Sequence, residues 1–101
     1  MGRVRALLLR RWWLVALVGA VIVFLGMQLV PYRVDNPAVI AEPSWDSPRT
    51  RALAVAACFD CHSNESRPLW FESIAPVAWL VKRDVDGGRE ALNFSEWGTP
   101  G

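Results

Sequence analysis

The sequence predicts an all-α protein, in which one N-terminal transmembrane helix is followed by a small helical domain. Three observations support this fold class. Residues 12–30 form an apolar run, two later segments have helical spacing and begin beside a proline, and nothing near the only two cysteines alternates like strands. A chain of 101 residues holds at most one small domain and its anchor.

The apolar run predicts a transmembrane signal anchor at residues 12–30. Gln28 is its only strongly polar residue, and its length suits a hydrocarbon core of roughly 30 Å. Residues 1–11 form a basic N-terminus with four arginines and no acidic side chain. The positive-inside bias therefore puts this N-terminus in the cytoplasm and the rest of the chain outside. We expect a single-pass protein of the cytoplasmic (inner) membrane, with its domain facing the periplasm or cell exterior.

Two other targeting signals compete with an uncleaved anchor. A cleaved signal peptide usually has an apolar core of about 7–15 residues, and this run is longer. The nearest small-x-small site, Val39-Ile40-Ala41, lies well beyond the run. The pair Arg10-Arg11 resembles a twin-arginine signal, although ordinary positive-inside charge explains it equally simply.

The segment 31–48 is rich in proline and predicts a linker. It contains four of the seven prolines of the chain, which favours an extended, irregular backbone. We expect a semi-stiff tether that lifts the next element off the bilayer. Trp45 interrupts it, and this side chain either packs on the domain or enters the lipid interface.

The domain is predicted to span residues 49–101, and its first helix has a clear start signal. Ser47 precedes Pro48, the pattern of an N-cap followed by proline at the first helical position. Good helix formers follow as far as Cys58. We expect this helix to deliver the cysteines at its C-terminal end, as in small cytochromes c.

The string Cys58-Phe59-Asp60-Cys61-His62 holds both cysteines and the single histidine of the chain. The spacing C-x-x-C-H is the attachment pattern of c-type haem. Each thiol forms a thioether with one vinyl group, and the imidazole reaches the iron as an axial ligand. On a helical turn the three side chains share one side. We therefore predict one covalent haem c per chain, bound by Cys58, Cys61 and His62, with His62 as the metal ligand.

Three other uses of these residue types compete with haem attachment. A structural zinc site needs four ligands, and no further Cys or His is present. A thioredoxin-like redox pair needs a βαβ context. A disulfide between Cys58 and Cys61 suits an oxidising compartment, but it leaves His62 without a role.

The remaining residues predict a second helix and a short closing turn. Leu69, Trp70, Phe71 and Ile74 are read either as core or as a wall around the haem. The second helix is expected to begin at Ala75-Pro76 and to end at Gly87-Gly88. After it, Arg89 is read as a solvated surface residue in preference to a partner of a haem propionate.

These residues together give the segment 49–97 a resemblance to the haem-binding domain family of bacterial membrane-anchored proteins. The matching strings are Cys58-Phe59-Asp60-Cys61-His62-Ser63-Asn64-Glu65-Ser66, Trp70-Phe71, Ile74-Ala75-Pro76-Val77-Ala78-Trp79-Leu80-Val81, Gly88-Arg89-Glu90 and Asn93-Phe94-Ser95-Glu96-Trp97. Pro68-Leu69 departs from the family pattern. The resemblance also implies further helix and a Met-Pro-Pro piece after Trp97, so we expect a partial, C-terminally truncated cytochrome c-like domain.

The second axial ligand of the iron has no obvious candidate. The resemblance implies a later methionine, whereas the methionines here are Met1 and Met27. Lys82 and Asn93 are the alternatives, although each also reads as an ordinary surface residue. An iron with one protein ligand would leave a position open for water or a diatomic gas.

The function expected from the sequence is electron transfer by a membrane-anchored c-type haem protein. The alternatives are a haem-based gas-binding module and a truncated remnant without haem. No catalytic residue is predicted, because no second titratable cluster accompanies the motif. Residues 31–101 carry seven basic and ten acidic side chains, a net charge of −3, which excludes nucleic acid as a partner. The membrane and an unidentified redox protein are the expected partners.

Overall fold

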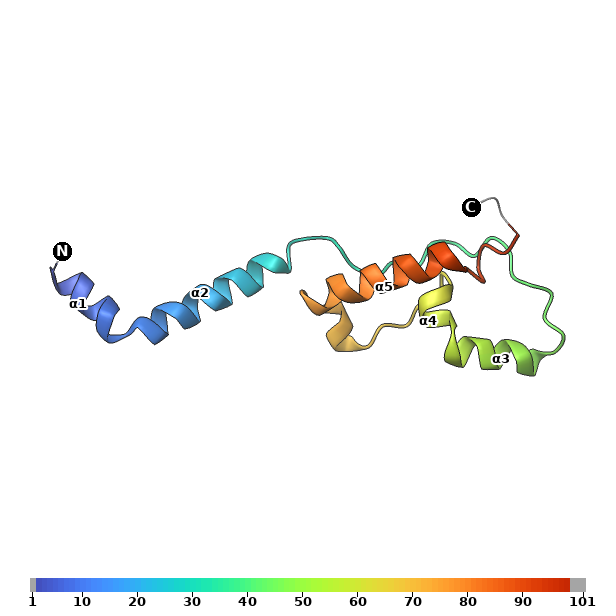
Figure 1. Cartoon of the computed structure of the whole chain (residues 1–101), viewed down its shortest axis with the longest axis horizontal. Helices are drawn as coiled ribbons and strands as arrows, with labels where there is room; N and C mark the ends of the chain where they lie inside the picture. Colours follow the sequence, from blue (N-terminus) through green and yellow to red (C-terminus); the bar gives the residue numbers. More distant parts are fainter. Residues whose placement is uncertain (1, 99–101) are drawn as a thin grey trace. The chain divides into compact units, whose positions relative to one another are not determined.

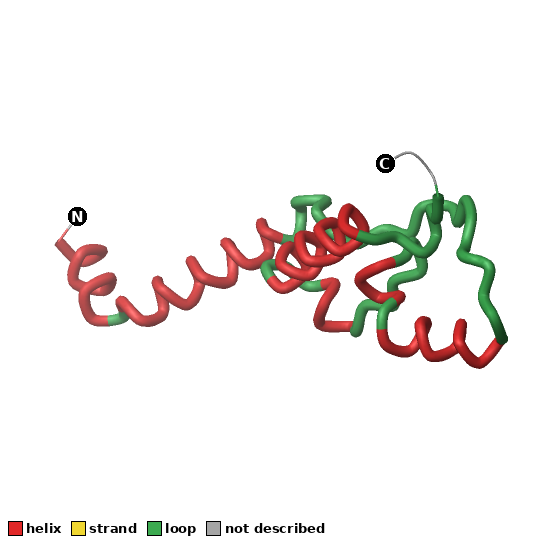
Figure 2. Tube along the Cα trace, turned by 45° about the vertical axis from the view of Figure 1, so that its right-hand side comes forward, coloured by secondary structure: helices red, strands yellow, loops and turns green. Residues whose placement is uncertain are grey.

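The computed structural model describes residues 2–98 and confirms the all-α prediction. The helices are α1 (Gly2–Arg10), α2 (Trp12–Met27), α3 (Pro48–Ala57), α4 (Phe59–His62), the 3-10 turn η1 (Trp70–Ser73) and α5 (Val77–Ala91). Figures 1 and 2 show no strand in this part of the chain. The chain divides into two compact units, residues 1–31 and 32–101. Residues 99–101 of the predicted domain lie outside the described residues.

The first unit consists of α1 and α2. The sequence predicted one helix over residues 12–30, but α2 ends at Met27, and the next three N–H groups bond to carbonyls three residues back. Pro31 accounts for the early end, because proline disfavours helical backbone at the residue before it. No single helix among residues 2–98 has both the length and the apolarity to cross a membrane. Only α1 and α2 together meet these criteria, and they are bent by 80°.

The beginning of α3 follows the local signal in the sequence. Ser47 Oγ accepts a hydrogen bond of 3.2 Å from the Thr50 N–H, and Pro48 is the first helical residue. The last bond of this helix joins the Cys58 N–H to the Ala54 carbonyl at 2.8 Å. Cys58 itself has φ −127° and ψ −28°, so the chain turns there and enters α4. The predicted helix and the position of the motif at its end are confirmed.

Helix α5 begins as predicted but ends later than predicted. Pro76 is its N-cap, and the helix continues through Gly87 and Gly88 to Ala91. The expectation that the two glycines end the helix was therefore wrong. A Cβ atom at Gly88 would collide with the carbonyl oxygen of Cys61. This glycine allows α5 to approach α4 closely, which is a tertiary requirement and not a helix stop signal.

The core is small and lies between α4, α5 and the C-terminal segment. Its fully buried apolar side chains within residues 2–98 are Phe59, Ala75, Ala78 and Val85. Phe59 stacks on Phe94 with ring centroids 5.6 Å apart, and Trp45 lies 5.6 Å from Phe94. Of the two positions considered for Trp45, the structure therefore shows the one that packs on the domain.

The proline-rich segment is extended, as predicted, but it does not stand free of the domain. The N–H groups of Ile40 and Ala41 donate to the Ser95 carbonyl at 2.8 and 3.0 Å, and the Trp97 N–H donates to the Ala41 carbonyl at 3.0 Å. These bonds fasten the segment along the C-terminal residues. It is part of the second unit, and the expectation of a free tether was wrong.

An ion pair fastens the same segment to α3. The guanidinium of Arg51 donates to Glu42 through Nη2 at 2.7 Å and Nε at 3.0 Å, and Trp45 Nε1 donates to the same carboxylate at 3.2 Å. The hydrogen bonds from Arg51 hold the pKa of Glu42 below its ordinary value of 4.5, against the opposing effect of partial burial.

We predict that Gly88→Ala lowers the free energy of unfolding by about 1–3 kcal/mol, because the new methyl group overlaps the Cys61 carbonyl. Gly87→Ala is the matched control, since its Cβ would point into open space. Gly87→Ala should raise stability by about 0.5–1 kcal/mol through reduced backbone entropy. Urea unfolding followed by circular dichroism measures both, and equal effects of the two substitutions would contradict the proposed close contact.

We also predict that Glu42 contributes to acid sensitivity. Its folded pKa is depressed, so its stabilising effect is present above the unfolded pKa and is lost as the pH falls below 4.5 through the folded pKa. Glu42→Gln should therefore be less stable than the native chain at neutral pH and lose less stability on acidification. Unfolding midpoints measured from pH 7 to below pH 4.5 test this, and a Glu42→Gln variant with the same pH dependence as the native chain would contradict the role of Glu42.

Candidate haem site

The structure places the three residues of the predicted site on one turn. Cys58 ends α3, while Cys61 and His62 form the last half of α4. The His62 N–H donates to the Cys58 carbonyl at 2.9 Å, which closes the turn. Both cysteines are free thiols, with Cys58 half-buried and Cys61 exposed. The arrangement provides two unpaired sulfurs and one imidazole within five residues.

The imidazole of His62 is oriented by the end of α5. Its Nδ1 lies 2.9 Å from the Gly88 carbonyl oxygen and 3.0 Å from the Leu92 carbonyl oxygen. Carbonyl oxygens only accept hydrogen bonds, so we assign the ring proton to Nδ1. The lone pair then resides on Nε2. Metal-binding histidines have this arrangement, in which one ring nitrogen donates to a carbonyl and the other binds the metal.

A cavity of about 260 Å³ lies beside Cys61. Leu69, Val81 and Val85 supply apolar surface to its wall, and Arg67 and Glu72 supply charge. Leu69 lines this cavity, whereas Trp70, Phe71 and Ile74 do not.

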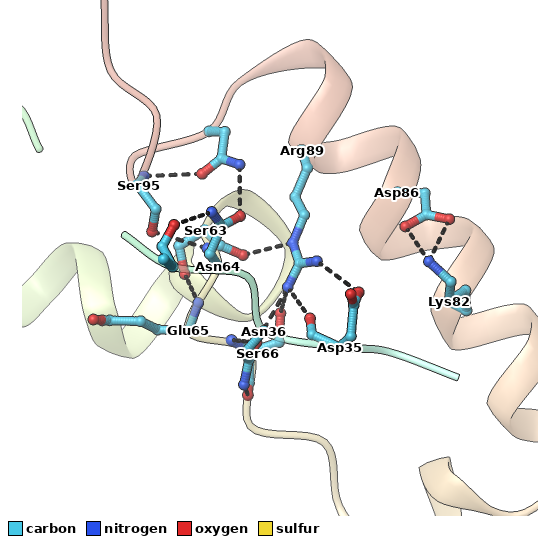
Figure 3. Close-up of polar contacts among 12 residues, drawn as sticks. Asp35, Asn36, Ser63, Asn64, Glu65, Ser66, Lys82, Asp86, Arg89 and Ser95 are labelled. Carbon is cyan, nitrogen blue, oxygen red and sulfur yellow. Dashed lines mark hydrogen bonds and ion pairs between the residues drawn. The ribbon is translucent and has the colours of Figure 1, made fainter. Parts of the chain in front are cut away.

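The loop after His62 is held by buried polar side chains (Figure 3). Ser63 Oγ donates to the Phe59 carbonyl at 2.7 Å, and Ser66 Oγ donates to the Asp60 carbonyl at 2.7 Å. The Asn64 N–H donates to Ser95 Oγ at 2.9 Å. The sequence showed this stretch only as a polar turn. Its burial was missed because serine and asparagine are common in exposed turns as well.

Arg89 is a structural residue of this loop, and the expectation of a solvated side chain was wrong. Only 11% of its side chain is exposed. Its Nε donates to the Ser63 carbonyl at 2.7 Å, and its Nη2 donates to the Asp35 carbonyl at 2.8 Å and Ser66 Oγ at 3.0 Å (Figure 3). These acceptors come from two distant parts of the chain, the extended segment and the loop after His62, which no local sequence pattern brings to Arg89.

The two proposed second ligands are engaged elsewhere. Lys82 Nζ lies 2.8 and 2.9 Å from the two carboxylate oxygens of Asp86. Asn93 Nδ2 donates to Asn64 Oδ1 at 2.9 Å. In the described part of the chain, no group of three or more His, Cys, Asp or Glu side chains is arranged to hold a metal ion, so the zinc alternative gains no support.

The all-helical fold and the oriented histidine beside two free thiols define a small haem-binding protein. The profile of the haem-binding domain family matches residues 22–100, and the chain therefore belongs to that family. Haem is its cofactor, which confirms this part of the sequence prediction. No curated protein and no solved structure matches the chain. The match begins within α2, in the first unit, and includes the proline-rich segment and the second unit as far as residue 100.

We predict that Arg89→Ala lowers the free energy of unfolding by about 1–3 kcal/mol, because buried carbonyl groups lose their charged donor. Arg83→Ala is the control on the same helix, since Arg83 is exposed. It should change stability by less than about 0.5 kcal/mol. Urea denaturation of both variants gives the comparison. An Arg89 variant as stable as the Arg83 variant would show that the network contributes nothing.

Proposed function

We propose that this protein is a membrane-anchored c-type haem protein that transfers electrons outside the cytoplasmic membrane. The observation that carries the proposal is the pair of hydrogen bonds that orient His62. They place the ring proton on Nδ1 and leave Nε2 free for an iron atom. The two free thiols on the same turn complete the donor set of a c-type site.

The side chains have separate roles in this proposal. Cys58 and Cys61 would hold the haem through one thioether bond each, and His62 Nε2 would ligate its iron. When bound, haem supplies one-electron redox chemistry, and the protein sets its position and surroundings. The carbonyls of Gly88 and Leu92 accept hydrogen bonds from the Nδ1–H group and hold the ring in one orientation.

Membrane anchoring is supported by the apolar surface of the first unit. Helix α2 contains 16 residues without a charged side chain, and it has no buried residue within the protein. Four arginines precede it on the N-terminal side. Lipid would cover this surface, and the positive-inside bias would direct the second unit outward. Haem c is attached outside the cytoplasm, which agrees with that topology.

A second candidate function is a ligand-binding haem module with an open axial position. The engagement of Lys82 with Asp86 and of Asn93 with Asn64 favours it, because neither side chain is left over to bind the iron. A six-coordinate low-spin spectrum supports electron transfer. A high-spin ferric spectrum with reversible binding of carbon monoxide supports the open site, and absence of a Soret band supports a haem-free remnant.

We predict that haem staining of a denaturing gel is lost in Cys58→Ala/Cys61→Ala after coexpression with haem-attachment machinery. Thioether bonds survive denaturation, whereas a haem held only by its iron does not. His62→Ala is the comparison. Any chain of that variant that acquires haem should still stain, because its sulfurs remain, but its optical spectrum should change through loss of the axial imidazole. Staining of the double variant would rule out thioether attachment.

A further inference from the structure

Apolar side chains remain exposed where η1 meets the beginning of α5. Trp70 is 78% exposed and Leu80 is 62% exposed, while Phe71 and Val77 are also exposed. The Trp70 and Phe71 rings contact edge to face, with centroids 5.7 Å apart. We call these four residues the η1–α5 tip. None of them lines the cavity beside Cys61.

The η1–α5 tip is fastened to the residues that directly follow the apolar segment. Arg33 Nε donates to the carbonyl of Ser73, the last residue of η1, at 3.0 Å. The ammonium group of Lys82 on α5 lies 5.5 Å from the centre of the Tyr32 ring. Both contacts are within the second unit, which begins at Tyr32.

Little chain separates this attachment from the apolar segment. Pro31 is the last residue of the first unit, and Arg33 is two residues further on. An extended chain advances at most about 3.6 Å per residue, so two residues span at most about 7 Å. The link between the apolar segment and the residue that holds η1 is therefore much shorter than a tether of the length of residues 31–48.

We propose that the η1–α5 tip inserts into the lipid interface of the membrane that holds the apolar segment. This inference rests on the proposed membrane anchor. Tryptophan is enriched at membrane interfaces, because an apolar ring with one polar N–H suits the headgroup level. Exposed Arg83 lies on the turn of α5 that follows Leu80, where a basic side chain favours anionic headgroups. The haem domain is then held directly on the bilayer surface.

The test uses the full, haem-loaded chain in vesicles of phosphatidylcholine and phosphatidylglycerol. A phospholipid with a diazirine group at the glycerol level is crosslinked by light, and mass spectrometry maps the labelled residues. We expect labels on Trp70, Phe71 and Leu80 as well as on α2. Exposed Trp97 should remain unlabelled, because it follows the opposite end of α5, a helix of about 22 Å.

Matched variants make the expectation quantitative. Trp70→Ser/Leu80→Ser should reduce labelling of Phe71 and Val77 by about tenfold or more, as the loss of two inserted apolar side chains implies. Leu53→Ser is the control, because Leu53 on α3 is as exposed as Leu80, at 62%. Both tip positions are exposed, so the substitutions should leave the fold intact, which circular dichroism checks.

The outcomes separate this inference from the proposed function. Labels on α2 without labels on the tip overturn the inference and leave the anchor in place. An α2 without labels shows that the anchor itself is wrong. A tip that is unlabelled in lipid but crosslinks to a second chain is a dimer interface, which also overturns the inference. The Soret absorbance of the same sample reports haem attachment independently of both.

Discussion

The hydrogen bonds between His62 and the end of α5 are the interaction on which the rest of the domain depends. A helix leaves its last carbonyl groups without intrahelical partners. Near the end of α5 the Gly88 carbonyl accepts from both the Leu92 N–H and the imidazole, and the Leu92 carbonyl accepts from the imidazole as well. In return, the Phe94 N–H donates to the His62 carbonyl at 2.7 Å. The same contacts therefore cap a helix and orient the proposed ligand.

The small apolar core explains why so much of the order comes from polar contacts. Besides its four buried apolar side chains, the described chain buries Ser63, Asn64, Ser66 and Ser95. Buried polar groups need hydrogen-bond partners, and the loop after the motif supplies them internally. A domain of this size buries a smaller fraction of its surface than a larger domain does, and small scaffolds often rely on a metal or cofactor for stability. Covalent haem next to Cys61 would add apolar contacts where the protein has few.

The sequence predicted those parts of the structure that depend on neighbouring residues. The start of α3 depends on Ser47 and Pro48 alone, and the turn that gathers the cysteines and His62 depends on their spacing. The C-x-x-C-H spacing predicted haem as the cofactor, and the family match confirms haem itself. Covalent attachment, the cytochrome c-like fold and the membrane anchor stay predictions.

The errors concern residues whose roles are set by distant parts of the chain. Gly88 reads locally as a helix end, yet the carbonyl of Cys61 on another helix decides its role. The acceptors of Arg89 lie 23 to 54 residues away in sequence, so its burial had no local signal. The proline content correctly indicated an extended segment, but prolines do not reveal whether such a segment is free or hydrogen-bonded to a domain.

Arg89 on α5 joins its own helix to two other parts of the second unit, the extended segment and the loop after His62. One guanidinium binds the Asp35 carbonyl of the extended segment and the Ser63 carbonyl directly after the proposed ligand. Asn36 adds a reciprocal pair with Ser66, donating to its carbonyl at 3.0 Å and accepting from its N–H at 2.9 Å. The residues that follow the apolar segment are therefore part of the structure that positions His62.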